Sequence, residues 1–335
     1  MSSMKTLVLT EKDVRKLLTM EDVIGAVELA FAEKSLKRVQ LPQKQYVFYE
    51  RYNGDLRTMQ SYLEGLDIST VKVVSVHPEN RVKNNLPTVV ATLLVIDPRN
   101  GVPIAIMGGS WITDIGTGAA GGVAAKHLAI KAPKTVGLVG AGAQAKTQLR
   151  AILTVYGKLA GVRVWSRTKE TRETFIKEME HVCAGKVDKI EAVEEAEDAV
   201  KGSELLVTTT SSKAPLVMDD WVSPGMHINC MGADAPGRQE LDPAILKRAK
   251  IVVDDLEQAS YSGEINVPLS QGKLKPKDIW GELGEIVAGL KKGRTSDDEI
   301  TVFASTGLAI QDAVTANIAY KNAMARRIGQ TVEVI

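Results

Sequence analysis

The pattern of hydrophobic and polar positions changes near residue 134. Upstream, five β-rich runs follow one another without intervening helices, which predicts an antiparallel or mixed sheet. Downstream, short apolar runs alternate with helical segments, a rhythm typical of a doubly wound, mostly parallel sheet. The upstream runs are 45–49, 56–62, 70–76, 89–96 and 102–107. The downstream runs are 135–139, 162–166, 189–192, 205–209, 227–231, 250–254 and 301–303.

Two helical segments determine the predicted domain organisation. Residues 113–131 are crowded with glycine and alanine, and we interpret them as a helix that links two domains and packs closely against a neighbour or a cofactor. Residues 306–327 form a long apolar helix that we expect to return to the N-terminal domain. The fold class is therefore α/β. We predict a discontinuous α+β domain formed by 1–116 with 306–335, and a doubly wound domain over 117–305.

A glycine-rich turn separates the first downstream strand from the helix that follows it. It consists of Gly140, Ala141, Gly142, Ala143, Gln144 and Ala145. In a strand–turn–helix context, this G-x-G-x-x-A spacing indicates a dinucleotide-binding, Rossmann-type domain. Gly140 permits the tight turn, Gly142 lets the backbone approach a pyrophosphate, and Ala145 lets the helix pack closely on the strand. The helix N-terminus offers unpaired N–H groups to the phosphates. The alternative is a tight turn that binds no ligand.

The end of the second downstream strand bears on the choice of cofactor. NAD(H) enzymes usually carry Asp or Glu there for the ribose 2′-hydroxyl, whereas this strand ends in Ser166, Arg167 and Thr168. An arginine binds a 2′-phosphate through its planar guanidinium, and the two hydroxyls can donate hydrogen bonds. NADP(H) is therefore favoured over NAD(H), the alternative being that Arg167 belongs to a solvated helix start. Later strand ends add three predicted cofactor contacts, Thr208, Thr209 and Met231.

Composition and charge argue against several other classes of protein. The chain has 335 residues, of which 44% are hydrophobic, and a net charge of +1. It has no basic cluster with interleaved aromatic residues, so we expect no nucleic-acid partner. We also expect no membrane association and a cytoplasmic location, because there is no apolar signal region and no run long enough to span a bilayer. Cys183, Cys230 and the four histidines form no metal-binding motif.

Short motifs spread along the chain carry a resemblance to a known family. They are GDLRTM at 54–59, VKVVSVHP at 71–78, LPTV at 86–89, TGAA at 117–120, VGAGAQ at 139–144, HINCMGAD at 227–234, GEIN at 263–266, ELGEI at 282–286 and STGLA at 305–309. In these motifs the chain resembles the ornithine cyclodeaminase/mu-crystallin family, and within it the archaeal alanine dehydrogenases. The WSRT segment at 165–168 is similar to that of the NADPH-using ketimine reductases.

The resemblance implies hydride transfer between nicotinamide C4 and a carbon bonded to nitrogen, and a homodimer formed through the discontinuous domain. It implies that Lys72 is the active-site lysine and that Asp234 is the acid/base or holds the substrate ammonium. The residues themselves leave alternatives open. Lys72 shares a strand face with two valines, where a partly desolvated ammonium suits proton exchange or anion pairing, or it is an edge lysine facing water. Asp234 follows a strand end, where it points into a cleft or forms a turn.

The resemblance also implies a carboxylate-binding set, from which this chain departs. Arg57 matches an Arg of the alanine dehydrogenases where the cyclodeaminases have Glu, which argues against ornithine cyclisation. Lys44 matches a cation position or is a surface lysine. Gly116 stands where the family has an Arg that clamps the substrate carboxylate, a loss of roughly 2 to 5 kcal/mol of binding. Other departures are Gln60 in place of Pro, and Gly108 and Ala304 in place of Asp.

These features predict an NADP(H)-dependent oxidoreductase that reduces imines or ketimines, or carries out reductive amination and the reverse amine or amino-acid dehydrogenation. The small-molecule substrate is then an imine, an amine or a keto acid. The missing Arg indicates a pocket altered for substrates without the usual carboxylate. One alternative is a plain alanine dehydrogenase that holds a carboxylate through Lys44, Arg57 and Lys72. Another is an NADPH-regulated, mu-crystallin-like binding protein with little catalysis.

Overall fold

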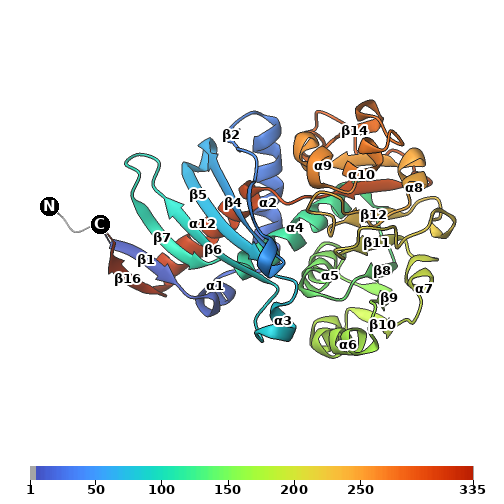
Figure 1. The fold of residues 1–335 in the computed structure, drawn as a ribbon, viewed down its shortest axis with the longest axis horizontal. Helices are drawn as coiled ribbons and strands as arrows, with labels where there is room; N and C mark the ends of the chain where they lie inside the picture. The colour runs from blue at the N-terminus through green and yellow to red at the C-terminus, as the bar shows by residue number, and fades with distance from the viewer. Residues whose placement is uncertain (1–4, 335) are drawn as a thin grey trace. The chain divides into compact units, whose positions relative to one another are not determined.

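The computed structural model describes residues 5–334. The chain divides into two compact units, most of whose helices and strands are labelled in Figure 1. The first unit runs to Gly116 and resumes at Leu308, and the second spans Thr117–Gly307. The boundary therefore lies inside helix α4 (Ser110–Leu128), within the stretch rich in glycine and alanine.

A mixed eight-stranded sheet forms the first unit (Figure 1). Its strands follow the order β16 (Gln330–Glu333), β1 (Lys5–Leu9), β7 (Pro103–Gly108), β6 (Val89–Ile96), β5 (Ile68–Val76), β4 (Gly54–Leu63) and β2 (Val39–Gln40), with β3 (Gln45–Tyr49) also paired to β4. The pairs are antiparallel except β1 with β7. Buried and less buried residues alternate along β4 and β5, so each strand has one face in the core. The predicted mixed sheet is confirmed.

Helix α12 (Ala309–Arg326) is the principal helix on this sheet. It packs against β4, β5 and β6 and against α2 (Met20–Ser35). The last long helix of the chain thus joins elements from the first hundred residues. The remaining short helices of this unit are α1 (Glu11–Leu17), α3 (Asn80–Lys83), η1 (Glu50–Tyr52) and η2 (Glu64–Leu66).

The second unit is built on a fully parallel eight-stranded sheet. Its order is β10 (Val187–Ala192), β9 (Leu159–Trp165), β8 (Thr135–Val139), β11 (Leu205–Thr208), β12 (His227–Cys230), β15 (Thr301–Ala304), β13 (Lys250–Val253) and β14 (Ile279–Glu282). From β8 the chain adds β9 and β10 on one side, and then β11 and β12 on the other. The switch point lies between β8 and β11, where sheets of this kind bind ligands at the carboxyl ends of their strands. The doubly wound fold is confirmed; β14 is an addition that the sequence patterns did not indicate.

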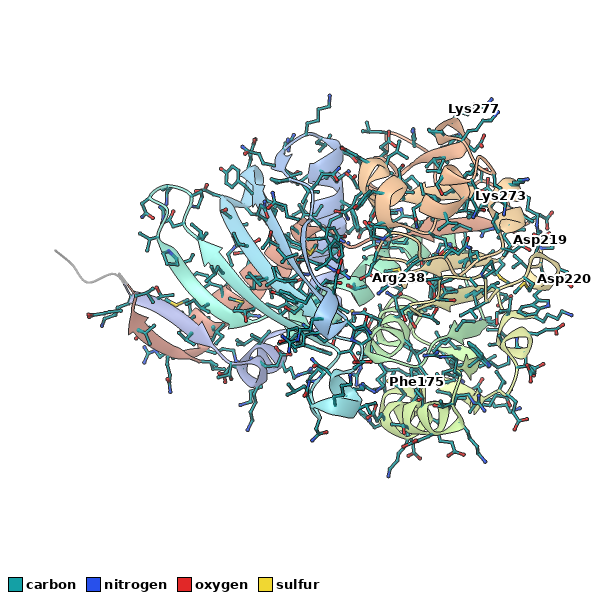
Figure 2. The ribbon with its side chains drawn as sticks, in the orientation of Figure 1. Phe175, Asp219, Asp220, Arg238, Lys273 and Lys277 are labelled. Carbon is teal, nitrogen blue, oxygen red and sulfur yellow. The ribbon has the colours of Figure 1, made fainter. Side chains whose placement is uncertain are left out.

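Helices cover this sheet and pack closely on one another. On α6 (Lys169–Cys183), Phe175, which is labelled in Figure 2, is fully buried. The small residues of α4 face α5, because a Cβ at Gly121 would lie 1.9 Å from Gln148 Oε1. The neighbour expected for that stretch is therefore a helix. The helices are α5 (Ala143–Tyr156), α6 (Lys169–Cys183), α7 (Ala196–Val200), α8 (Pro243–Arg248), α9 (Leu256–Ser262), α10 (Asn266–Ser270), α11 (Leu283–Val287), η3 (Asp219–Trp221) and η4 (Pro276–Asp278).

Candidate active site

The glycine turn follows β8 at the switch point of the parallel sheet. Gly140 has a φ of +113°, a backbone conformation that residues with a side chain rarely adopt. A Cβ at this position would also lie 2.4 Å from Thr209 Oγ1. The turn therefore packs directly against the segment that follows β11, and both observations require glycine at 140.

The turn and the start of α5 fit the pyrophosphate of a dinucleotide. Gly142 is the N-cap residue of α5, and no side chain caps the helix there. A Cβ at Gly142 would meet no atom within 4 Å, so the backbone is open on that side. Thr209 Oγ1 is buried and has no hydrogen-bond partner among residues 5–334. Uncapped N–H groups, an open glycine and an unpaired hydroxyl are all groups that a phosphate can use.

The other residues of the turn differ in exposure. Ala141 and Ala145 are buried, whereas Ala143 is exposed and Gln144 is half-buried. Ala145 has 0% exposure, and its small side chain lets the first turn of α5 pack closely on the sheet, as its place in the motif predicts.

The end of β9 carries Arg167 between two hydroxyl residues that have protein partners. Ser166 Oγ donates to the Thr168 carbonyl at 3.2 Å. Thr168 is the N-cap of α6, and its Oγ1 accepts from Thr171 N at 3.3 Å. Arg167 is exposed, and no hydrogen bond or ion pair to another described residue holds its guanidinium. Since both hydroxyls are already used locally, Arg167 is the group of these three that is free to bind a phosphate.

The ends of β11 and β12 face the protein interior more than the sequence suggested. Thr208 is 0% exposed, and its hydroxyl donates to Glu240 Oε2 at 2.7 Å. Met231 is 7% exposed. The Thr208 hydroxyl is therefore used in a hydrogen bond within the protein interior. Thr209 is the threonine that presents an unpaired hydroxyl beside the glycine turn.

Asp234 lies in a turn and has a cationic partner. Its backbone N–H donates to the Gly232 carbonyl at 3.1 Å. Its carboxylate forms an ion pair with Arg238, which is labelled in Figure 2. The Asp234 side chain is 33% exposed, so it forms a turn and also keeps a carboxylate that a ligand can reach.

In the first unit, Lys72 forms a buried ion pair with Asp312. Lys72 lies on β5, between β4 and β6, and is 5% exposed, which rules out the edge lysine facing water. Its Nζ donates to Asp312 Oδ1 on α12 at 2.8 Å. Asp312 Oδ2 is buried without a hydrogen-bond partner in the described part of the chain. Burial raises the pKa of Asp312, although the charges of Lys72 and Lys44 act in the opposite direction.

Arg57 is held in place by two neighbours on the same sheet. It is 4% exposed. The Asp55 carboxylate accepts hydrogen bonds from Arg57 Nε at 2.9 Å and from Arg57 Nη2 at 3.1 Å. The guanidinium lies over the Tyr46 ring, 5.4 Å from its centroid. These contacts fix the plane of the guanidinium and offset part of its charge.

Gly116 faces α12 beside the Lys72 partner. A Cβ at Gly116 would lie 3.5 Å from Thr315 Oγ1 and 3.8 Å from Gln311 Cβ, which are ordinary contacts. Gln311 is 4% exposed, and its Nε2 is buried with no hydrogen-bond partner in the range 5–334. Gln311 directly precedes Asp312, so position 116 lies next to the helix that carries the buried carboxylate.

Two departures from the family pattern have a structural counterpart. At Gly108 a Cβ would lie 2.7 Å from Glu11 N, so no side chain fits while α1 keeps its position. The Glu11 carboxylate accepts from Trp111 N at 2.7 Å and thus supplies an acid at the start of α4. Next to Ala304, the turn at 305–307 is held by Asp254, whose Oδ2 accepts from Thr306 N at 2.6 Å.

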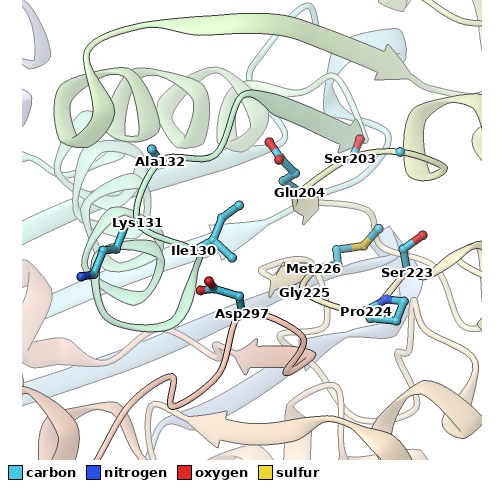
Figure 3. A pocket seen from close by; sticks show the side chains of 11 residues that line it. Ile130, Lys131, Ala132, Ser203, Glu204, Ser223, Pro224, Gly225, Met226 and Asp297 are labelled. Carbon is cyan, nitrogen blue, oxygen red and sulfur yellow. The ribbon is translucent and has the colours of Figure 1, made fainter.

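A cavity of about 630 Å³ lies at the amino-terminal ends of the strands of the parallel sheet (Figure 3). It is lined by residues that come just before β8, β11 and β12, among them Ala132, Glu204 and Met226. Ligands of doubly wound sheets bind at the carboxyl ends of the strands. This cavity, at the amino ends, is therefore not the candidate active site.

Across residues 5–334 no group of three or more His, Cys, Asp or Glu side chains is placed to hold a metal ion. In the same range, no helix has the length and hydropathy needed to cross a membrane.

Three residues that contact the predicted site residues were not identified from the sequence: Asp312, Arg238 and Glu240. Asp312 carried a signal, because Gln311 and Asp312 interrupt an otherwise apolar run at the start of a predicted buried helix. Arg238 and Glu240 lie in an irregular loop, where no periodicity separates a buried polar residue from a solvated one.

A parallel sheet with a glycine turn at its switch point, in a chain whose first unit holds a buried lysine–aspartate pair, defines the class of dinucleotide-dependent oxidoreductases. Within that class the assignment can be made more closely. The chain belongs to the ornithine cyclodeaminase/mu-crystallin family, whose model matches residues 4–327.

Individual relatives agree with this assignment over nearly the whole chain. The alanine dehydrogenase of Archaeoglobus fulgidus is 44% identical over 330 residues, covering 98% of this chain and 99% of that protein. An archaeal alanine dehydrogenase dimer with bound NAD has a TM-score of 0.93 at 42% identity, covering 99% and 100% of the two chains. The Thermococcus litoralis Δ1-pyrroline-2-carboxylate reductase, solved with NADH and L-proline, has a TM-score of 0.94 at 40% identity, covering 98% and 100%. The predicted family and the predicted enzyme class, an NAD(P)H-dependent oxidoreductase, are confirmed.

Proposed function

We propose that this chain is an NADP(H)-dependent oxidoreductase that reduces the C=N bond of small imines or ketimines, formed beforehand or from a carbonyl compound and ammonia. The reverse reaction is amine or amino-acid dehydrogenation. The observation that carries the proposal is the buried Lys72–Asp312 pair, which places an ammonium beside a carboxylate oxygen that has no partner among the described residues. A C=N nitrogen that gains or loses protons requires a donor and an acceptor of this kind.

The chain's own residues divide the remaining tasks. The dinucleotide supplies the hydride when it is bound. In our proposal Lys72 Nζ supplies the proton that the nitrogen gains when its carbon receives the hydride, and Asp312 Oδ2 accepts a hydrogen bond from the substrate N–H group. Asp234, with its partly exposed carboxylate, holds or moves a further proton. Arg57, oriented by Asp55, holds an anionic or carbonyl oxygen of the substrate.

The preference for NADP(H) rests on Arg167. Its guanidinium is exposed and unengaged, and no carboxylate stands at the end of β9 to repel a 2′-phosphate. The two solved relatives described above carry NAD and NADH, so both cofactors must be compared. We expect Arg167→Asp to weaken NADPH relative to NADH by about 10- to 100-fold, the scale of a charged hydrogen bond. Lys169→Asp is the matched control, since Lys169 is also exposed but pairs with Glu173; equal shifts in both variants would contradict the assignment.

The substrate class rests on Gly116. An arginine at this position would add a carboxylate clamp beside α12, and the contacts at its Cβ permit a side chain. If the pocket suits substrates without a carboxylate, Gly116→Arg should block their turnover, while Gly116→Ala should change little. If the clamp is only weakened, the same arginine should lower the KM of a keto acid.

Alanine dehydrogenase activity is the second candidate. It is favoured by the 44% identity to the Archaeoglobus fulgidus enzyme and by the cations Lys44, Arg57 and Lys72 in one unit. A homodimer belongs to the same proposal and is supported by the dimer named for the archaeal relative. Sedimentation equilibrium tests it directly.

Steady-state kinetics with NADPH and with NADH test the function. The substrates are pyruvate with ammonia, a cyclic imine that carries a carboxylate, and a cyclic imine without one. We expect the fastest turnover with NADPH and an imine. Fastest turnover with pyruvate and ammonia would favour the second candidate. Absence of turnover with every pair, in a protein that still binds NADPH, would favour a binding protein instead.

A further inference from the structure

One buried carboxylate connects the ends of two adjacent strands in the second unit. Glu240 Oε2 accepts from Thr208 Oγ1 at 2.7 Å and from Gly232 N at 3.1 Å, and Oε1 accepts from Thr210 N at 2.6 Å. Thr208 ends β11 and Gly232 follows β12, and these strands are parallel neighbours. The carboxylate thus joins two loops at the carboxyl ends of these strands.

These two loops pack closely on one another. A Cβ at Gly232 would lie 2.1 Å from the Thr210 carbonyl oxygen and 2.7 Å from Glu240 Oε2. Thr209 lies between the two threonines that Glu240 binds, and its Oγ1 would touch a Cβ at Gly140. The segment that Glu240 binds therefore packs against the glycine turn through Thr209.

Glu240 is itself fixed by a second buried carboxylate. Glu264 accepts from the backbone N–H groups of Glu240 at 2.8 Å and of Leu241 at 2.7 Å. On its other side the Glu240 carbonyl accepts from Leu216 N at 2.7 Å and from Val217 N at 3.1 Å. Hydrogen bonds therefore hold the Glu240 backbone through both its N–H and its carbonyl group.

The burial of two carboxyl groups without a cationic partner by itself destabilises the folded state. Glu240 and Glu264 are 0% and 1% exposed, and neither forms an ion pair with a described Lys, Arg or His. Burial raises the pKa of both carboxyls, and the charge of Glu240 raises that of Glu264 further. An apolar side chain at 240 would avoid this desolvation. Buried polar groups are retained in some proteins because they specify one geometry, and here that geometry is the position of the two loops.

We propose that Glu240 is a positioning residue for the dinucleotide: through Thr208, Thr210 and Gly232 it sets the position of Thr209 beside the glycine turn, and thereby the affinity for the cofactor. The inference rests on the proposed function, because it concerns the same cofactor site. It adds a residue that touches neither cofactor nor substrate.

Glu240→Gln is a sharp test because the amide cannot replace the carboxylate. Thr210 N–H faces one oxygen and Gly232 N–H faces the other. Either orientation of a glutamine turns its NH₂ group toward a backbone donor, which leaves one buried N–H unpaired. Glu204→Gln is the matched control. Glu204 also accepts a hydrogen bond from a backbone N–H group, that of Thr135 at 3.1 Å, but it lies at the amino-terminal ends of the strands of the same sheet.

The experiment measures the Kd of NADPH and of NADH by fluorescence titration, kcat at saturating cofactor, and the thermal midpoint of each variant. We expect both glutamine variants to lower the thermal midpoint. Only Glu240→Gln should raise the cofactor Kd, by about tenfold, the scale of one buried hydrogen bond. Its kcat at saturating cofactor should fall much less than its affinity.

The outcomes separate the inference from the function it rests on. If wild type binds neither cofactor, the proposed function fails and the inference fails with it. If wild type binds and Glu240→Gln binds equally well, or if Glu204→Gln weakens binding as much, only the inference is overturned. Should Glu240→Gln not fold, Glu240→Asp keeps the charge but shortens the reach, and it is judged by the same comparison.

Discussion

Breaking the Lys72–Asp312 pair should destabilise the protein far more than removing both residues together. The Nζ–Oδ1 distance is 2.8 Å, and the two side chains are only 6% and 5% exposed. Water therefore cannot screen a charge left behind. Removing one partner of a buried pair typically costs about 3–5 kcal/mol, whereas replacing both by apolar residues is often neutral. We expect Lys72→Met and Asp312→Leu each to lower the free energy of unfolding by that amount, and the double variant by less than either.

The two single variants should differ in their pH dependence. Burial already raises the pKa of Asp312, and Lys72 opposes that rise. In Lys72→Met the carboxyl is left without this opposing charge, so its folded-state pKa rises further above the unfolded value. A group of this kind contributes stability that is present below the unfolded pKa and is lost as the pH rises through the folded pKa. The deficit of Lys72→Met should therefore widen as the pH rises above 3.8, the ordinary pKa of an aspartate, and the double variant should lack this slope.

Urea denaturation of the four proteins at several pH values provides the measurement, completed as a double-mutant cycle. Turnover is recorded in parallel, because Lys72→Met should also abolish it. If the double variant is destabilised by the sum of the singles, the pair contributes nothing through its interaction. If Lys72→Met shows no dependence on pH, Asp312 is not the buried carboxyl that the ion pair stabilises.

Further predictions concern positions outside the proposed site. Gly108→Asp should lower the free energy of unfolding by about 1–3 kcal/mol, because its Cβ meets Glu11 N at 2.7 Å. Gly25→Ala, in the exposed middle of α2 with no atom near its Cβ, should raise it by about 0.5–1 kcal/mol; calorimetry that ranks the two the other way would contradict both. His227 is fully buried, and burial lowers its pKa from 6.5 to about 3. Its contribution is present above the unfolded pKa and is lost as the pH falls below it, so His227→Gln should flatten the decline of the thermal midpoint on acidification, and an unchanged slope would show that another group is responsible.

The motifs of the second unit could be predicted because they are local. Gly140 adopts a φ of +113° that glycine alone adopts readily, and the strand and helix on either side are each encoded within about a dozen residues. In contrast, only the folded geometry showed that Thr168 caps α6 and that Ser166 Oγ donates to the Thr168 carbonyl, which leaves Arg167 unengaged.

The sequence by itself determined most of the strands, the order of the two kinds of sheet and the glycine turn, because backbone dihedrals and hydrophobic period are set by neighbours in the chain. Tertiary structure alone decided which buried polar groups meet. Lys72 and Asp312 are 240 residues apart, and Thr208 and Glu240 are 32 apart. Such partners are chosen by the way whole elements pack. A buried charge is stable only where packing brings a partner or donor to it, so its role follows from the topology and is not written in the residues around it.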